Sequence, residues 1–199
     1  MLRMTRTFIA LAASSALALQ AAPVWAQAPG ALYTVVVPSS QFGSPNFTQL
    51  VVNGLAAARA FCGKLENKAY VVDCLAERLD AVSDQMDLEG NTGDDYAEVR
   101  SILSDTSGKL QKLARDNRDR ALPRGKASTT SGSTTIRTSR PLTPVAAPAA
   151  ADVNAQATAI LDEAETLLLR SAAGSSDKTA QYTRIAEALR SNKVLIRST

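Results

Sequence analysis

The sequence predicts an all-α protein, in which helical hairpins form a small bundle with an extended N-terminal arm and a disordered linker. Apolar residues recur at steps of three and four along five stretches after residue 44, which is the period of amphipathic helices. A short β-branched run before residue 44 ends at a proline, and residues 122–151 are dominated by Ser, Thr, Pro and Ala. These three observations predict the helices, the arm and the linker in turn.

Residues 1–26 have the layout of a secretory signal peptide. Arg3 and Arg6 give a positive start, residues 7–22 are an apolar run rich in alanine and leucine, and Ala26 is a small residue of the kind that precedes a cleavage site. We therefore expect a periplasmic or secreted bacterial protein. The alternative is an uncleaved membrane anchor, for which the run is short. No later segment approaches the length of a membrane span, so no stable span is expected after cleavage.

Cleavage after Ala26 removes Arg3 and Arg6 and lowers the formal charge of the chain from +3 to +1. It leaves 173 of the 199 residues, enough for one ordinary domain or two small ones. A nearly neutral chain lacks the concentrated basic face of a nucleic-acid-binding protein. We therefore expect no nucleic-acid partner.

The mature chain is predicted to open with an extended arm, residues 27–44. Within it, Leu32 to Val37 is an apolar run rich in β-branched residues, and Pro38 follows directly. A proline is tolerated at the edge of a sheet but not in a central strand. The run is therefore predicted as either an edge strand or an apolar strap over a helical core.

Cys62 and Cys74 are the only cysteines, and apolar residues surround each of them. In an oxidising compartment such a pair usually forms a disulfide. One straight helix would separate the Cα atoms by about 18 Å, whereas a disulfide needs them about 4.4–6.8 Å apart. The chain must therefore reverse between them, and Gly63 followed by the polar residues 64–68 suits a corner. The alternative is redox catalysis, which usually has C-x-x-C spacing.

Residues 45–121 are predicted as a three-helix region clamped by this disulfide. Ser44 and Pro45 form a start signal for its first helix. The apolar stripes of the three helices repeat in a heptad-like register, which is typical of antiparallel helical hairpins. They consist of Phe47, Leu50, Val51, Gly54, Leu55, Ala58, Phe61 and Cys62; of Val72, Leu75, Leu79, Val82 and Met86; and of Tyr96, Val99, Leu103, Thr106, Leu110 and Leu113.

Residues 122–151 are predicted as a disordered linker. They include the basic residues Arg124, Lys126, Arg137 and Arg140 and no acidic residue. A segment of this composition cannot bury enough apolar surface to order itself. Its charges are spread out and no aromatic residue accompanies them, so we interpret the segment as a solvated tether rather than a surface for anionic lipid, polysaccharide or nucleic acid.

Residues 152–199 are predicted as a C-terminal helical hairpin that turns near Gly174. Asp152 is a capping residue at its start. The apolar faces consist of Val153, Ala157, Ile160, Leu161, Ala164, Leu167 and Leu168, and of Tyr182, Ile185, Ala186 and Leu189. Fewer than 50 residues form too small a core for an independent domain. The hairpin must therefore pack on the first three helices or on another molecule.

The stretch 87–98 matches part of the pattern of a calcium-binding EF-hand loop. Its oxygen-bearing residues at positions one, three, five, nine and twelve are Asp87, Glu89, Asn91, Asp95 and Glu98. Thr92 replaces the glycine of the sharp turn, and Asp94 replaces a residue that is normally apolar. The alternative is an acidic connector that caps the following helix. A calcium-responsive module is therefore the first alternative function, and apart from calcium in that alternative no cofactor is expected.

The sequence offers no recognisable catalytic site. It contains no histidine, the commonest general base and transition-metal ligand. It also lacks a glycine-rich phosphate loop after a strand and a G-x-S-x-G motif. An enzyme of unrecognised type is the second alternative, and no catalytic residue is assigned to it.

We therefore expect an exported, non-catalytic helical protein that acts as a binding or structural module of the cell envelope. Its candidate contact surfaces are the apolar faces within residues 72–86, 96–113 and 153–168. The alternative for these faces is that they meet one another inside one intramolecular bundle. The expected partner is an envelope protein or a second copy of the chain.

Overall fold

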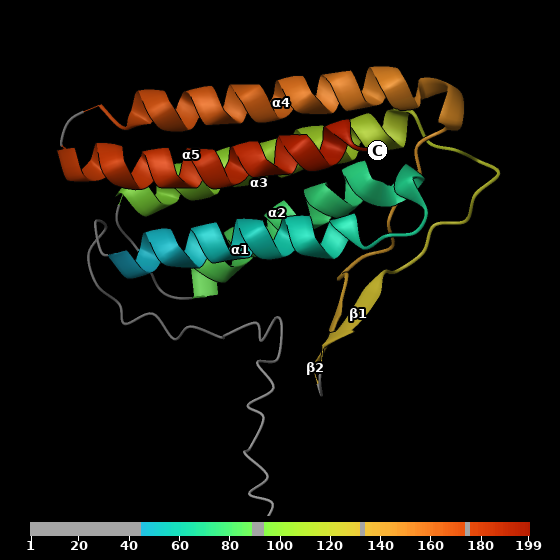
Figure 1. The fold of residues 1–199 in the computed structure, drawn as a ribbon, viewed down its shortest axis with the longest axis horizontal. Helices are drawn as coiled ribbons and strands as arrows, with labels where there is room; N and C mark the ends of the chain where they lie inside the picture. The colour runs from blue at the N-terminus through green and yellow to red at the C-terminus, as the bar shows by residue number, and fades with distance from the viewer. Residues whose placement is uncertain (1–44, 89–93, 132–133, 174–175) are drawn as a thin grey trace, which may run out of the picture.

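A computed structural model of the protein describes residues 45–88, 94–131, 134–173 and 176–199 (Figure 1). The predicted signal peptide and arm lie outside these ranges. The fold class predicted from the sequence is confirmed, because helices pack in pairs into a small bundle and the sheet is a minor hairpin. The elements are α1 (Pro45–Gly63), η1 (Lys68–Tyr70), α2 (Val71–Leu88), α3 (Asp94–Asp116), β1 (Ser128–Ser131), β2 (Thr134–Arg137), η2 (Ala147–Ala149), α4 (Ala150–Ser171) and α5 (Ser176–Arg197).

The C-terminal hairpin of α4 and α5 docks on the first three helices. Helix α5 packs on α4 and on α1, while α3 packs on α2 and on α4. Figure 1 shows α4 along one side of the bundle, α5 between α4 and α1, and α2 beside α1. The hairpin thus shares its apolar surface with the other helices, which provides the core that its own length cannot.

The apolar stripes that predicted the helices form the core. Phe47, Leu79, Leu103, Leu161 and Ile185 come from all five helices, and each is fully buried. Burying such a side chain stabilises the fold by about 1.5–3 kcal/mol. The bundle is therefore held mainly by the contacts that the three- and four-residue spacing indicates.

The disulfide between Cys62 and Cys74 fixes the corner between α1 and α2. Their Cα atoms lie 5.8 Å apart, and both residues are fully buried. The reversal uses a short polar turn, in which the Asn67 side chain accepts a hydrogen bond of 3.0 Å from the Ala69 N–H at the start of η1. The predicted chain reversal and the pairing of the two cysteines are both confirmed.

Residues 122–151, predicted as a disordered linker, are instead ordered wherever they are described. They contain the antiparallel hairpin β1–β2, with Thr129 opposite Ile136 and Thr130 opposite Thr135. Farther along, Leu142 and Val145 are buried in the common core. The prediction of disorder in this segment is therefore corrected.

Two buried carboxylates of α2 hold this segment in place. Asp73 accepts hydrogen bonds from the Arg140 guanidinium at 2.7 and 2.9 Å and from the Thr143 N–H at 2.6 Å. Glu77 accepts hydrogen bonds from the Ser139 N–H at 2.7 Å and from its hydroxyl at 3.0 Å. Each partner is more than 60 residues away along the chain. The composition of the segment predicts disorder because the two carboxylates that fix the segment in place belong to another helix, α2.

A cluster of charges joins α4 to α5. Glu165 is 7% exposed and accepts hydrogen bonds from Arg190 and from Lys193, whose Nζ lies 2.5 Å from Glu165 Oε2. Lys193 is 8% exposed and also donates to Asp162. Because a buried charge without a partner is costly, these pairs favour a single register between the two helices.

Acid is expected to weaken this cluster through Glu165. Hydrogen bonds from Arg190 lower the pKa of Glu165, burial raises it, and Lys193 lowers it further, so that the net pKa lies below the ordinary value of 4.5. Such a carboxyl stabilises the fold above its unfolded pKa, and the stabilisation is lost as the pH falls through the folded pKa. Glu165→Gln is therefore expected to reduce the drop in Tm between about pH 5 and about pH 2. Thermal unfolding measured across this pH range gives the fall in Tm, and Glu66→Gln, at an exposed position, is the control. An equal fall in Tm for the wild type and for Glu165→Gln would contradict the role of Glu165.

Gly54→Ala is expected to lower the free energy of unfolding by about 1–3 kcal/mol, because α1 and α2 approach closely at this residue. A Cβ added to Gly54 lies 2.9 Å from Val82 Cγ2, a branched side chain with little freedom to move. Gly108→Ala is the matched control: its added Cβ meets nothing within 4 Å, and removing a glycine from a helix interior is expected to stabilise by about 0.5–1 kcal/mol. Urea unfolding measures both. Equal changes in the free energy of unfolding for Gly54→Ala and Gly108→Ala would show that the two helices are not in close contact.

Candidate functional site

The three apolar faces expected as contact surfaces lie mostly inside the bundle, although Leu167 of the third face is 40% exposed. Leu75, Leu79, Leu103, Leu110 and Leu161, taken from all three faces, have no exposed surface. The faces meet one another, which is the intramolecular alternative. A surface for a partner among the described residues is therefore found elsewhere on the bundle.

The five residues of the EF-hand-like pattern are only partly described. Glu89 and Asn91 lie outside the described residues. Asp87 belongs to the last turn of α2, and Asp95 to the first turn of α3. Within the described ranges, no group of three or more acidic, cysteine or histidine residues is arranged to hold a metal ion. The pattern at 87–98 thus stays a prediction from the sequence.

Glu98, the last residue of that pattern, contacts α5. Its Oε2 accepts a hydrogen bond of 3.0 Å from the Tyr182 hydroxyl, and Lys178 Nζ lies 3.6 Å from the same oxygen. The carboxylate that would complete a calcium loop is therefore paired within the bundle. These contacts tie α3 to α5.

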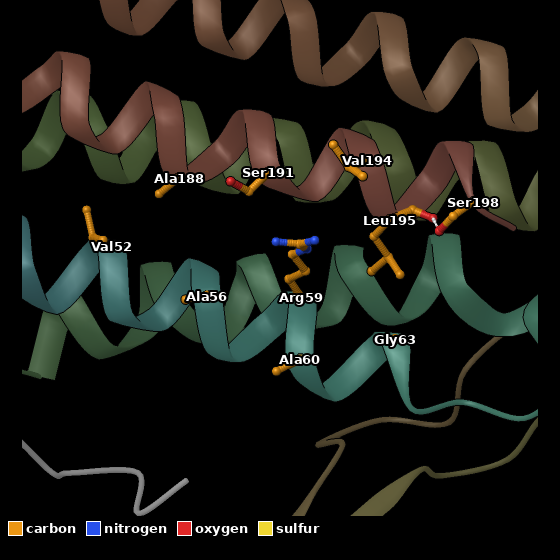
Figure 2. Close-up of a pocket in the computed structure, with 10 residues that line it drawn as sticks. All are labelled: Val52, Ala56, Arg59, Ala60, Gly63, Ala188, Ser191, Val194, Leu195 and Ser198. Carbon is orange, nitrogen blue, oxygen red and sulfur yellow. Dashed lines mark hydrogen bonds between the residues drawn. The ribbon is translucent and has the colours of Figure 1, made fainter. Parts of the chain in front are cut away.

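The exposed side of α1 borders an open groove shared with α5 (Figure 2). The groove has a volume of about 510 Å³, and most of its wall is apolar or small. Helix α1 contributes Val52, Ala56, Arg59, Ala60 and Gly63, and α5 with its C-terminal end contributes Ala188, Ser191, Val194, Leu195 and Ser198. Small side chains keep the two backbones accessible along the groove, so a bulky partner side chain or a helix can approach closely.

Exposed apolar surface and one cation characterise this groove. Val194 is 55% exposed, the largest exposed fraction of any large apolar side chain in the described chain. Arg59 is the one charged residue among those that line the groove, and Figure 2 shows its side chain extending from α1 toward α5. It is exposed, and it forms no ion pair with another described residue. The groove therefore combines an unpaired positive charge with an apolar wall.

A second groove lies on the opposite flank of α1, between α1, α2 and the β-hairpin. Its volume is about 440 Å³. The wall includes Phe61, Val82 and Ile136, and its charged residues are Lys64 and Arg78. Arg78 is paired with Glu77 at 2.5 Å, and its guanidinium lies 5.0 Å from the centre of the Phe61 ring.

The outer face of α1 separates the two grooves. Ala56 and Ala60 line both of them, and both are exposed. The apolar periodicity predicts the buried stripe of α1, but it does not predict a binding surface on this outer face. Alanine is neither strongly apolar nor polar, so an alanine-rich helix surface gives no clear pattern. The available signal was the run Ala56–Ala60, in which one arginine interrupts four alanines on a helix whose other face is apolar.

Comparison with protein families, with curated proteins and with solved structures gives no match for this chain. Among the described helices, none combines the length and the low polarity that crossing a bilayer requires. The disulfide is the feature that bears on the cellular compartment, since paired cysteines persist mainly in oxidising environments.

Proposed function

We propose that the protein is an exported, non-catalytic module of the bacterial cell envelope that binds another envelope protein through the α1–α5 groove. The leader-like residues 1–26 and the buried disulfide support export. The absence of histidine from the whole sequence supports a binding role rather than a catalytic one.

The partner is a protein segment that presents an acidic, amphipathic helix. The observation that carries this proposal is Arg59: an exposed cation, unpaired among the described residues, in a groove whose lining includes no acidic residue. An acidic side chain on an apolar helix face complements both features. Charge complementarity of this kind contributes specificity and a faster association rate.

The dimensions of the groove suit a helix. Its lining on α1 runs from Val52 to Gly63, which spans about 16 Å, or three helical turns. Helix-in-groove recognition uses apolar anchors spaced by three and four residues, and the groove offers Val194 and Leu195 as their counterparts. The small residues Ala56, Ala60 and Ala188 leave room for such anchors.

Site-specific photo-crosslinking in the cells that make the protein tests this proposal. A photo-reactive residue at Val194 is expected to give an adduct, and one at Leu169, another large apolar residue that is 42% exposed on α4, is the matched control. Arg59→Glu is expected to reduce the yield of the adduct at Val194 strongly. Lys64→Glu, directly after α1 in the wall of the second groove, is expected to leave it unchanged.

The identity of the adduct decides between the possible occupants. Peptide mapping is expected to place the crosslink in an acidic helical segment of a different protein. An adduct with a second copy of this chain, an adduct insensitive to Arg59→Glu, or equal adducts at Val194 and Leu169 would each contradict the proposal.

A further inference from the structure

The groove between α1, α2 and the β-hairpin is suited to bind an extended segment of polypeptide chain. Thr129 and Ile136 are directly opposite each other in the hairpin, and both line the groove. One face of the hairpin is therefore turned toward α1 and α2. The opposite wall is formed by small or apolar residues of the two helices, including Gly54, Ala57 and Ala81.

The hairpin itself presents free strand edges. The sheet has two strands in the described chain, so neither β1 nor β2 has a second strand beside it. Unpaired strand edges are templates for the addition of another strand, and two strands alone are only marginally stable. The hairpin is anchored to α2 at its base, where Arg78 donates a hydrogen bond of 3.4 Å to the Arg137 carbonyl oxygen.

The chain has a segment of suitable composition directly before α1. Leu32 to Val37 reads Leu-Tyr-Thr-Val-Val-Val, with β-branched residues at four of its six positions, and Pro38 ends the run. Residues 27–44 contain no charged side chain. Burying this segment in the groove would therefore bring no additional charge against the apolar wall.

The segment is long enough to reach the groove. Residues 38–44 separate Val37 from Pro45, the first residue of α1. The eight steps from Val37 to Pro45 span at most about 29 Å when extended. Gly54 and Phe61 of the groove lie about 14 and 24 Å from Pro45 along α1. An arm that folds back along α1 thus brings Leu32 to Val37 over the groove.

We propose that Leu32–Val37 occupies the groove between α1, α2 and the β-hairpin as an intramolecular strap beside the hairpin. A tethered segment has an effective concentration in the millimolar range, so it outcompetes a free peptide of similar affinity. The strap covers one flank of α1 and leaves the α1–α5 groove open. This proposal is independent of the proposed partner, because the two grooves use different residues apart from Ala56 and Ala60.

Distance measurement between two spin labels on the full chain tests the strap. The two native cysteines are joined to each other, so cysteines introduced at Val36 and at Asp84, an exposed residue of α2 that does not line the groove, are the reactive thiols. A short distance with a narrow distribution is expected. A broad distribution centred at long distances would overturn the proposal. The narrow peak is also expected to survive dilution of the labelled protein with an excess of unlabelled protein; its loss would show that the arm enters the groove of a second copy instead.

Variants on both sides of the contact sharpen the test. Val35→Asp in the arm and Ala57→Arg in the groove are each expected to remove the narrow peak, because one places a charge against an apolar wall and the other fills the groove. Ser40→Asp in the arm and Ala155→Arg on the exposed face of α4 are matched controls, expected to retain it. Circular dichroism confirms that each variant is folded. Persistence of the peak in folded Val35→Asp and Ala57→Arg would overturn the assignment.

Discussion

Asp73→Ala is expected to lower the free energy of unfolding by about 3 kcal/mol and to release the segment around Arg140 and Thr143 from α2. Asp73 has no exposed surface, and its carboxylate accepts three hydrogen bonds from that segment. Without it, the Arg140 guanidinium loses its ion pair and the buried Thr143 N–H loses its acceptor. Leaving such groups unsatisfied costs more than the pair contributes when intact.

Two measurements follow the loss of Asp73. Urea unfolding gives the change in stability, and amide hydrogen exchange is expected to accelerate at Leu142 and Thr143 before it does in the helices. Asp84→Ala, an exposed position of the same helix, is the matched control and is expected to change stability by less than about 0.5 kcal/mol. Equal effects of Asp73→Ala and Asp84→Ala, or unchanged exchange at Leu142 and Thr143, would show that Asp73 does not hold the segment.

Removal of the disulfide is expected to lower the free energy of unfolding by about 3 kcal/mol in the chain-entropy account. The bond joins residues 12 positions apart at the α1–α2 corner, where both cysteines are fully buried. Cys62→Ala together with Cys74→Ala removes the bond without introducing a polar atom into the core. The cavity left by the two sulfur atoms adds to the loss.

Reduction of the wild-type protein gives an independent measure of the same bond. The oxidised and the reduced protein are compared by urea unfolding, and the reduced form is expected to have a lower midpoint with a similar or larger slope, because its unfolded chain is less constrained. The double alanine variant must be insensitive to reductant. Equal midpoints for the oxidised and reduced wild type would contradict a structural role for the bond.

Much of the fold follows from local patterns in the sequence. Ser44 and Pro45 indicate the start of α1, Gly63 its end, and the two cysteines require a corner between them. These features depend on neighbouring residues or on spacing along one helix, which a sequence displays directly. The length of the C-terminal hairpin predicts that α4 and α5 need a larger core, but it does not decide whether the first three helices or another molecule supplies that core.

The order of residues 122–151 does not follow from such patterns. The segment is ordered by Asp73 and Glu77 of α2. In the sequence, these two acidic residues are indistinguishable from ordinary surface residues. Arg140 likewise reads as one of four scattered cations in a segment rich in Ser, Thr and Pro. Only the three-dimensional arrangement brings Asp73 and Arg140 together, so composition gives the wrong prediction for this segment.

The candidate site, the α1–α5 groove, could not be predicted from the sequence either. Apolar faces are the natural place to look for a binding surface, yet Leu79 and Leu103 are buried against their neighbours. The exposed surface includes the alanine-rich side of α1 with Arg59 and Val194 on α5, as well as Leu167 and Leu169 on α4. A groove forms between two helices where the side chains that face each other are small. The apolar periodicity of a single sequence does not predict which side chains face each other.

The central claim is that the α1–α5 groove receives an acidic helix of another protein, and exchange of the two charges tests it most directly. Calorimetric titration with the segment identified by crosslinking at Val194 is expected to show that Arg59→Glu weakens binding by about tenfold or more, equivalent to about 1.4 kcal/mol. Changing the contacted acid of the segment to lysine is expected to restore binding to Arg59→Glu and to weaken binding to the wild type. A Kd that Arg59→Glu leaves unchanged, or a loss that the reversed segment fails to recover, would contradict the claim.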